Sequence, residues 1–133
     1  MNDDKTALTM RLELVPIPVR DIDRAKAFYA DAAGFDVDHD VAPAEGVRIV
    51  QLTPPGSACS IVLGLGVGVF DSMQPGAVQG LHLVVDDITA VRAAMLARGV
   101  EMGPIDDMGG VKYAAFSDPD GNSWTLQEIP AGV

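Results

Sequence analysis

The sequence has a single cysteine and no long hydrophobic run, and each of these shortages excludes a class of protein. Cys59 has no second cysteine to pair with, so an intrachain disulfide framework is impossible and a reducing compartment is the default. No apolar run approaches the roughly 20 residues that span a bilayer. The first ten residues, MNDDKTALTM, lack the basic start and apolar stretch of a signal peptide. We therefore expect a cytoplasmic protein.

Basic residues are also scarce, since 9 Lys and Arg stand against 19 Asp and Glu and give a formal net charge of −10. Phosphate groups would repel such a chain, which excludes nucleic acid and anionic membrane as expected partners. The composition favours a protein that handles small molecules. The alternative, that the negative charge serves only solubility, stays open at this point.

The chain of 133 residues is 48% hydrophobic, which suits one domain with a real core, spanning residues 1–133. Within it, one pattern of strand, helix and three strands occurs twice. Module one covers about residues 10–64 and module two about residues 79–130. The Gly-rich segment at about 65–78 is expected to be a linker.

In module one, a β-rich run containing Pro16 and Pro18 precedes a helix, and its prolines favour an edge strand. Asp21 can cap the helix, and Gly34 is suited to end it in the left-handed conformation. Turn residues separate the segments that follow. The expected strands of this module are Leu12–Val19, Phe35–Val41, Val47–Thr53 and Ala58–Leu63.

Module two repeats this order, with Asp86 or Asp87 as the helix cap and Gly99 as its end. Asp21 and Asp87 lie 66 residues apart, and Gly34 and Gly99 lie 65 apart. The expected strands are Gly80–Val85, Val100–Met102, Val111–Ser117 and Ser123–Ile129. The predicted fold is α+β: two βαβββ modules form an eight-stranded, cup-shaped mixed sheet with two flanking helices. The concave face of such a cup is a natural ligand site.

Two stretches, VPIPVRDIDRAKAFYADAAGF and FSDPDGNSWTLQE, resemble the opening and closing motifs of the vicinal oxygen chelate superfamily. This is the glyoxalase, bleomycin-resistance and extradiol dioxygenase group. The resemblance runs from about Leu12 to Glu128 and places each motif in the corresponding half of the duplicated unit. It implies a homodimer and, in the metal-dependent members, a divalent cation held by His, Glu or Gln side chains in the cup.

Carried over to this chain, the ligand positions of the family fall on Leu14, Gly80 and Thr125, and the internal repeat adds Ser60. Leucine and glycine side chains offer no donor atom, and neutral hydroxyls bind metals weakly without carboxylate or imidazole support. We therefore predict no metal and no other cofactor. The alternative is a divalent ion such as Fe, Mn, Ni or Zn on displaced ligands, with Glu13 or His82 as candidates.

Strand alternation from these positions predicts a mainly apolar concave face with a few polar groups. Its predicted members are Leu12, Leu14, Pro16, Arg48, Val50, Ala58, Ser60, Gly80, His82, Val84, Tyr113, Ala115, Ser123, Thr125 and Gln127. The predicted ligand-binding residues among them are Leu14, Arg48, Ser60, His82, Tyr113, Thr125 and Gln127. Trp124 is the neighbour of Thr125 on the same strand, so its side chain points to the other face of the sheet and should pack under the helices.

Each polar candidate also has a simpler interpretation. His82 could be a general acid or base, or a histidine without chemistry. Arg48 could pair with a ligand carboxylate or enolate, or stand solvated on its strand. Tyr113 could stack on a flat ligand, or only pack. Cys59 lies in an apolar run, and we predict that it is a small buried hydrophobic residue rather than a nucleophile.

The sequence thus predicts a glyoxalase- or bleomycin-resistance-like protein that binds a small, largely apolar or aromatic molecule without a metal. The alternative is an enzyme of the lyase, isomerase or dioxygenase type, either metal-dependent with displaced ligands or metal-free with His82 as the acid or base. A third possibility is an accessory domain whose cup has lost its role.

Overall fold

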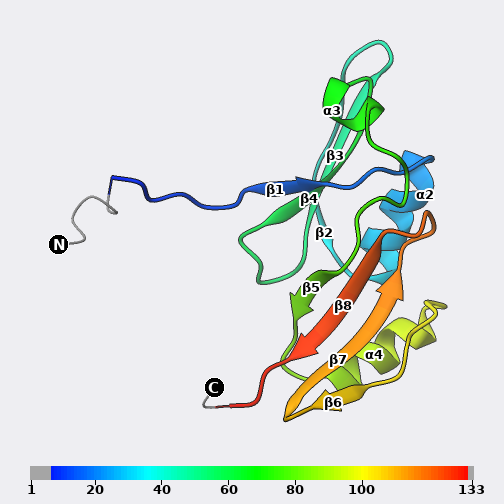
Figure 1. The fold of residues 1–133 in the computed structure, drawn as a ribbon. Coiled ribbons are helices and arrows are strands. Elements are labelled where there is room, and N and C mark those ends of the chain that lie inside the picture. Colours follow the sequence, from blue (N-terminus) through cyan, green and yellow to red (C-terminus); the bar gives the residue numbers. More distant parts are fainter. Residues whose placement is uncertain (1–6, 132–133) are drawn as a thin grey trace.

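The computed structural model describes residues 7–131 and confirms the two βαβββ modules (Figure 1). Module one contains β1 (Leu14–Pro16), α2 (Ile22–Ala27), the π-helix η1 (Phe28–Ala32), β2 (Asp36–Ala44), β3 (Val47–Thr53) and β4 (Ser60–Leu65). A short helix, α3 (Gly68–Asp71), interrupts the segment expected to be a plain linker. Module two contains β5 (Leu81–Val84), α4 (Ile88–Ala97), β6 (Asp106–Met108), β7 (Val111–Ser117) and β8 (Ser123–Glu128).

Both main helices begin and end where their sequences place the signals. Asp21 and Asp87 each accept a hydrogen bond from a backbone N–H of the first helical turn, which satisfies one of its unpaired donors. The helix of module one ends at Gly34, whose φ of 78° lies in the left-handed region that glycine adopts without strain. None of the helices in residues 7–131 is long and apolar enough to cross a membrane.

The eight strands form two four-stranded mixed sheets, in the orders β1-β4-β3-β2 and β5-β8-β7-β6. The predicted α+β fold of two βαβββ modules is confirmed, with its eight strands divided between two sheets; in the described part of the chain, no hydrogen-bonded ladder joins them. Edge strand β1 shows why. The N–H of Ile17 donates to Val62 on β4, so the alternate positions, Pro16 and Pro18, face the free edge without a donor. The prediction of an edge strand from these prolines is confirmed.

The expected strand Val100–Met102 is also wrong, because this segment forms the end of α4 and enters the core. The N–H of Val100 bonds to the carbonyl of Met95, and the N–H of Gly99 bonds to that of Leu96. This pattern is the Schellman motif, and Val100 and Met95 are both buried beside it. The second strand of module two begins only at Asp106.

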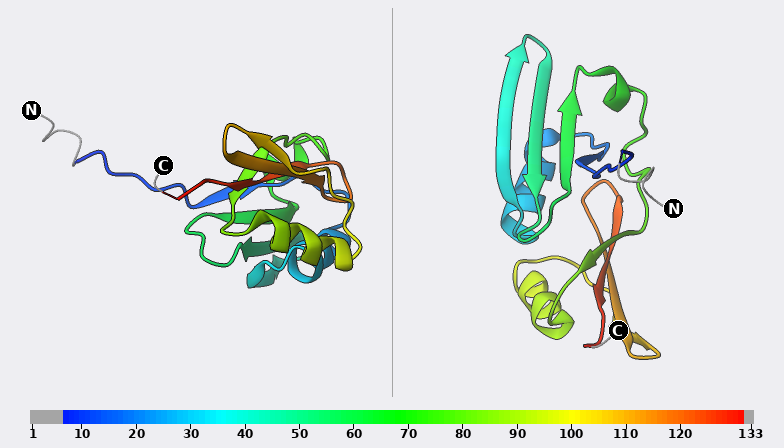
Figure 2. Two further views of the ribbon diagram at one scale, coloured as in Figure 1. Left: turned by 90° about the horizontal axis from the view of Figure 1, so that it is seen from below. Right: turned by 90° about the vertical axis from the view of Figure 1, so that its left-hand side faces the viewer.

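One hydrophobic core lies on the helix side of both sheets and unites the modules. Figure 2 shows α4 against one face of the sheet formed by β5 to β8. The aromatic part of this core joins Tyr29 and Phe35 of module one to Trp124 of module two, with ring centroids 5.5 to 5.8 Å apart. Trp124 is 3% exposed, which confirms its predicted core position.

A buried polar network crosses this core at the DPDGN turn. The hydroxyl of Tyr29 donates to Oδ2 of Asp118 over 2.7 Å and accepts from Nε1 of Trp124 over 3.0 Å. Asp118 also accepts from the backbone N–H groups of Asp120 and Asn122 and from the Asn122 side chain. Burial, with the Asp118 carboxylate adding to it, raises the pKa of the Tyr29 hydroxyl, so this group remains a protonated donor.

Asn122 extends the network to the loop between β1 and α2 and to the segment that leads into β5. It is fully buried. Its Nδ2 donates to the carbonyl of Pro18 over 2.9 Å, and its Oδ1 accepts from the N–H of Val78 over 3.1 Å. Among the described residues, no buried side-chain nitrogen or oxygen lacks a partner. The turn therefore fixes module two onto module one through satisfied buried hydrogen bonds.

We expect Tyr29→Phe to lower the free energy of unfolding by about 1–3 kcal/mol, because it leaves Nε1 of Trp124 without an acceptor in the core. Denaturant unfolding followed by Trp124 fluorescence measures this change. The matched control is Tyr113→Phe on an open sheet face, which should change the free energy by no more than about 0.5 kcal/mol. Equal effects of the two substitutions would contradict the role assigned to the network.

Candidate functional site

The concave face of the first sheet is defined by the register of its strands. Leu14 pairs with Ser60, while the neighbouring residues Ile61 and Leu63 of β4 belong to the core. Because side chains alternate along a strand, Leu14 and Ser60 lie on the face opposite to the helices, as predicted. Cys59, just before β4, is half-buried and does not join the core cluster, so its predicted full burial is wrong.

A chain of hydroxyl groups lies on this face. The hydroxyl of Thr53 donates to the carboxylate of Asp38, so the 2.6 Å contact between Thr53 and Ser60 has the Ser60 hydroxyl as its donor. Ser60 Oγ keeps its acceptor capacity. Thr53 and Asp38 were not among the predicted site residues, because Asp38 reaches this face from a bulge in β2 that the sequence did not signal.

An aromatic ring from α3 covers the far end of the same face. Gly64 has the same parity as Ser60 on β4, and a Cβ added to Gly64 would lie 2.4 Å from ring carbons of Phe70. The ring of Phe70 therefore packs directly on the strand backbone. Sequence reasoning missed Phe70, although a glycine inside a strand is a signal for close approach of another group.

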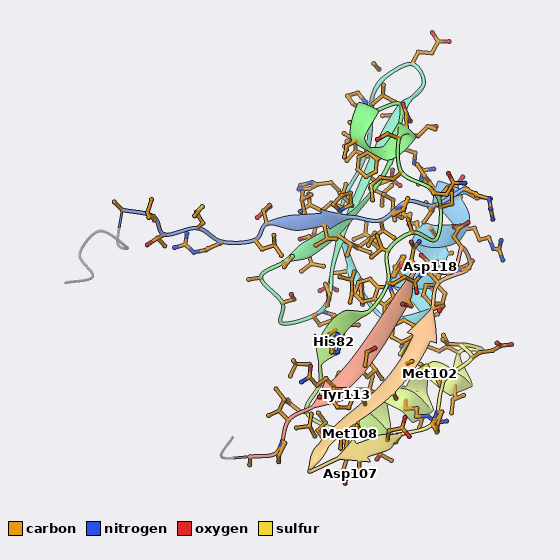
Figure 3. The ribbon with its side chains drawn as sticks, viewed as in Figure 1. His82, Met102, Asp107, Met108, Tyr113 and Asp118 are labelled. Carbon is orange, nitrogen blue, oxygen red and sulfur yellow. The ribbon has the colours of Figure 1, made fainter. Side chains whose placement is uncertain are left out.

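The second sheet brings together four of the seven predicted residues. Thr125 pairs with His82 on one side and with Ala115 on the other, and Gln127 pairs with Tyr113. The rings of His82 and Tyr113, labelled in Figure 3, lie edge to face with centroids 6.2 Å apart. The alternate residues of β8, Trp124 and Leu126, are buried in the core on the other side. The predicted concave register of β5, β7 and β8 is confirmed.

His82 has one ring nitrogen committed to the backbone. Its Nδ1 lies 2.8 Å from the carbonyl oxygen of Gly80, and a carbonyl only accepts, so Nδ1 carries the proton. In the neutral ring this leaves Nε2 as an acceptor. The exposed side chain can thus take a hydrogen bond from a ligand hydroxyl or receive a proton.

Arg48 was predicted on the concave face together with Val50, and this prediction is wrong. Val50 is fully buried in the core, so Arg48 lies on the helix face of β3. Its Nη1 lies 2.6 Å from Oδ1 of Asp23 on α2, and its Nε and Nη2 donate to Asp40. The residues of β3 on the concave face are instead Ile49, Gln51 and Thr53.

Arg48 belongs to an ion-pair cluster that supports the helix. Lys26 Nζ lies 2.7 Å from Oδ2 of Asp40, next to the two bonds from Arg48. Hydrogen bonds from Arg48 and then from Lys26 hold the pKa of the Asp40 carboxyl well below its usual range. Hydrogen bonds to Asp40 and Asp23 raise the pKa of Arg48 in turn. The role of Arg48 is therefore structural.

The donor set does not fit the divalent metal that the fold family implies. Of the four positions, Leu14 and Gly80 have no donor atoms in their side chains, and the hydroxyl of Ser60 is already bonded to Thr53. In residues 7–131, no three His, Cys, Asp or Glu side chains gather where they could hold a metal ion. Glu13 has the opposite parity to Leu14 on the strand that leads into β1, so its side chain points to the other face.

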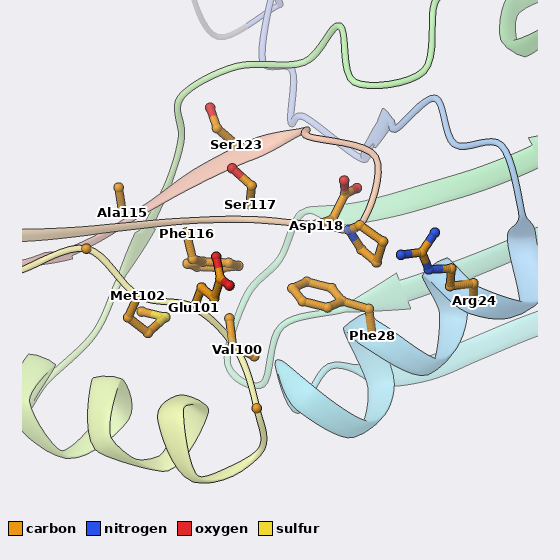
Figure 4. Close-up of a pocket in the computed structure, with 13 residues that line it drawn as sticks. Arg24, Phe28, Val100, Glu101, Met102, Ala115, Phe116, Ser117, Asp118 and Ser123 are labelled. Atoms are coloured by element: carbon orange, nitrogen blue, oxygen red, sulfur yellow. The ribbon is translucent and has the colours of Figure 1, made fainter.

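Two cavities are lined mainly by residues outside the predicted concave face, although Ala115 and Ser123 line the first and Val84 lines the second. The larger, about 780 Å³, opens between β7, residues 99–103 and the helix of module one, with Arg24 and Glu101 on opposite sides (Figure 4). The second, about 380 Å³, lies between the modules on the helix side. None of the seven predicted ligand-binding residues lines either cavity. Those residues instead occupy the open concave faces of the two sheets.

Comparisons with known proteins agree with this fold. The family model of the Glyoxalase/Bleomycin resistance protein/Dioxygenase superfamily matches residues 11–126. The structure of TnmS3, an antibiotic binding protein from Streptomyces sp. CB03234, is 36% identical with a TM-score of 0.81, over 92% of this chain and 98% of that chain. A glyoxalase/bleomycin resistance protein from the same organism is 38% identical with a TM-score of 0.75, over 87% and 98%. The uncharacterized protein YetH of Bacillus subtilis (strain 168) is 28% identical over 120 residues, 86% of this chain and 94% of its own.

We expect Arg48→Gln to lower the free energy of unfolding at neutral pH by about 1 kcal/mol or less, because its ion pairs are partly exposed. A depressed carboxyl pKa stabilises the folded state above the unfolded value, about 3.9 for Asp, and this contribution is lost as the pH falls below it. Denaturant unfolding at several pH values should therefore show the difference between wild type and variant shrinking in acid. Arg24→Gln is the control, since the side chain of Arg24 has no ion pair within residues 7–131. A difference that grew in acid would contradict this assignment.

Proposed function

Because the chain belongs to the Glyoxalase/Bleomycin resistance protein/Dioxygenase superfamily, we propose that it binds a small, largely apolar or aromatic molecule on the concave faces of its sheets, without a metal ion. One observation carries the proposal. The positions that hold metal ligands in the metal-dependent members are Leu14, Ser60, Gly80 and Thr125 here, and they offer no carboxylate or imidazole. Without these donors the concave faces can still bind a small molecule through apolar, aromatic and hydroxyl groups, and this is the function that we propose.

The chemistry of the concave faces supports an aromatic or apolar ligand. His82 and Tyr113 offer two rings at an edge-to-face angle of 81°, beside the polar groups of Thr125 and Gln127. The first sheet offers Leu14, the Phe70 ring and the Ser60 hydroxyl chain. Such a surface, mainly apolar with a few fixed polar groups, is typical of small-molecule sites. The description of the similar protein TnmS3 as an antibiotic binding protein supports the same class of function.

The proposal includes a homodimer, which the segment before β1 supports. Leu8, Met10 and Leu12 alternate with polar residues and are 64%, 85% and 69% exposed. This segment extends away from the rest of the molecule (Figure 1). A row of exposed apolar side chains on one side of an extended chain favours contact with a second copy. Sedimentation velocity tests the dimer, and a monomer at micromolar concentration would overturn this part of the proposal.

A second candidate function is metal-free acid–base catalysis by His82, and the geometry of its ring favours it. With Nδ1 bonded to Gly80, Nε2 has a fixed orientation and stays available to a substrate. A lyase or isomerase reaction would use this nitrogen to accept a proton. Turnover of an identified substrate that is unchanged in His82→Ala would remove this candidate.

We expect the protein purified without chelators to contain far less than one equivalent of Fe, Mn, Ni or Zn per chain, because the site offers too few donors. Elemental analysis by mass spectrometry measures this directly. Adding each metal in turn should leave the melting temperature unchanged, since a ligand that binds only the folded state raises it. A stoichiometric metal that raises the melting temperature would contradict the proposal.

A further inference from the structure

The smaller cavity lies between the modules on the helix side, and its lining is mainly apolar. Module one contributes residues 33–35 and the turn at Pro54 and Pro55. Module two contributes β5 and one face of α4, including Leu83 and Ala94. Its volume of about 380 Å³ falls at the small end of the range of ligand pockets in proteins.

Among residues 7–131, Arg98 is the only charged residue that lines this cavity. The guanidinium has no hydrogen bond or ion pair with any residue in 7–131. The end of α4 is already capped by the backbone, because the N–H groups of Gly99 and Val100 bond to the carbonyls of Leu96 and Met95. The cationic group is therefore free for another partner.

The guanidinium reaches across the boundary between the modules. Arg98 follows directly after α4 of module two, as its C-cap residue. A Cβ added to Gly34 of module one would lie 3.6 Å from Nη1 of Arg98. Gly34 and Arg98 both line the cavity. The exposed side chain of Arg98 thus brings its charge to the edge of the cavity, beside apolar side chains, and the lining residues in 7–131 include no carboxylate.

We propose that this cavity is a second ligand site, which binds a small amphipathic carboxylate. The apolar tail of the ligand enters the cavity between the modules, and its carboxylate pairs with Arg98 at the wall. An apolar volume selects for a hydrocarbon or aromatic tail, and a planar guanidinium matches a carboxylate through two parallel hydrogen bonds. None of the seven predicted ligand-binding residues lines this site, and it does not depend on the function proposed for the concave faces.

Titration with phenylbutyrate, followed by amide chemical shifts of the full chain, tests the site. Saturable shifts should appear at the amides of Leu83, Val85 and Ala94, with no saturable shift at His82 or Tyr113. The neutral amide, phenylbutyramide, should bind about fivefold more weakly, the size expected for an ion pair at a partly exposed arginine. No saturable shift at millimolar phenylbutyrate, or saturation at His82 and Tyr113, would overturn the proposal.

Two pairs of variants assign the binding to these residues. Arg98→Gln should bring the affinities for phenylbutyrate and phenylbutyramide together, while the control Arg24→Gln keeps the preference for the acid. Ala94→Leu should fill the cavity and reduce affinity for both compounds at least tenfold, while Ala93→Leu, on the same helix outside the lining, leaves it unchanged. An acid preference that survives Arg98→Gln, or equal binding by the two leucine variants, would overturn the proposal.

Discussion

The hydrogen bond from Tyr29 to Asp118 is the contact on which the arrangement of the molecule depends. It joins the helix of module one to the turn before the last strand of module two, two segments 89 residues apart in the chain. A buried carboxylate is costly unless it is fully bonded, and Asp118 has four donors from three residues. With no strand ladder between the two sheets in the described residues, this network and the shared aromatic core hold the modules together.

Much of the fold could be predicted because several segments have one clear periodicity. In β8, Trp124 and Leu126 alternate strictly with polar residues, so its buried and open faces are unambiguous. The helix caps at Asp21 and Asp87 and the end at Gly34 follow from local chemistry that packing did not override. The internal repeat predicted the order of strands and helices in each half of the chain, and the two observed βαβββ modules confirm that order.

The errors arose where the sequence has no such clear signal. Strand β3 has apolar residues at both parities, Ile49 as well as Val50, so alternation alone could not decide which face holds Arg48. Strand β6 begins with Asp106 and Asp107, residue types that are rare in strands, while apolar Val100 serves to end a helix. Gly64 inside β4 signals the close approach of another group, but no local pattern identifies that group as Phe70 of the linker.

The concave face and the helix face of the two sheets differ in chemistry. In residues 7–131 the concave faces offer rings and hydroxyls but no group of three side chains that could hold a metal ion, and the helix side has an apolar cavity lined by Arg98, which has no ion pair with a described residue. The central claim is that ligand binding on the concave faces needs no metal. Titration calorimetry with a compound selected from aromatic and polyketide-like molecules tests it most directly, in buffer with EDTA and in buffer with added Zn²⁺ or Mn²⁺. We predict the same dissociation constant in both buffers; binding that requires the metal, or falls tenfold or more with EDTA, would contradict the account.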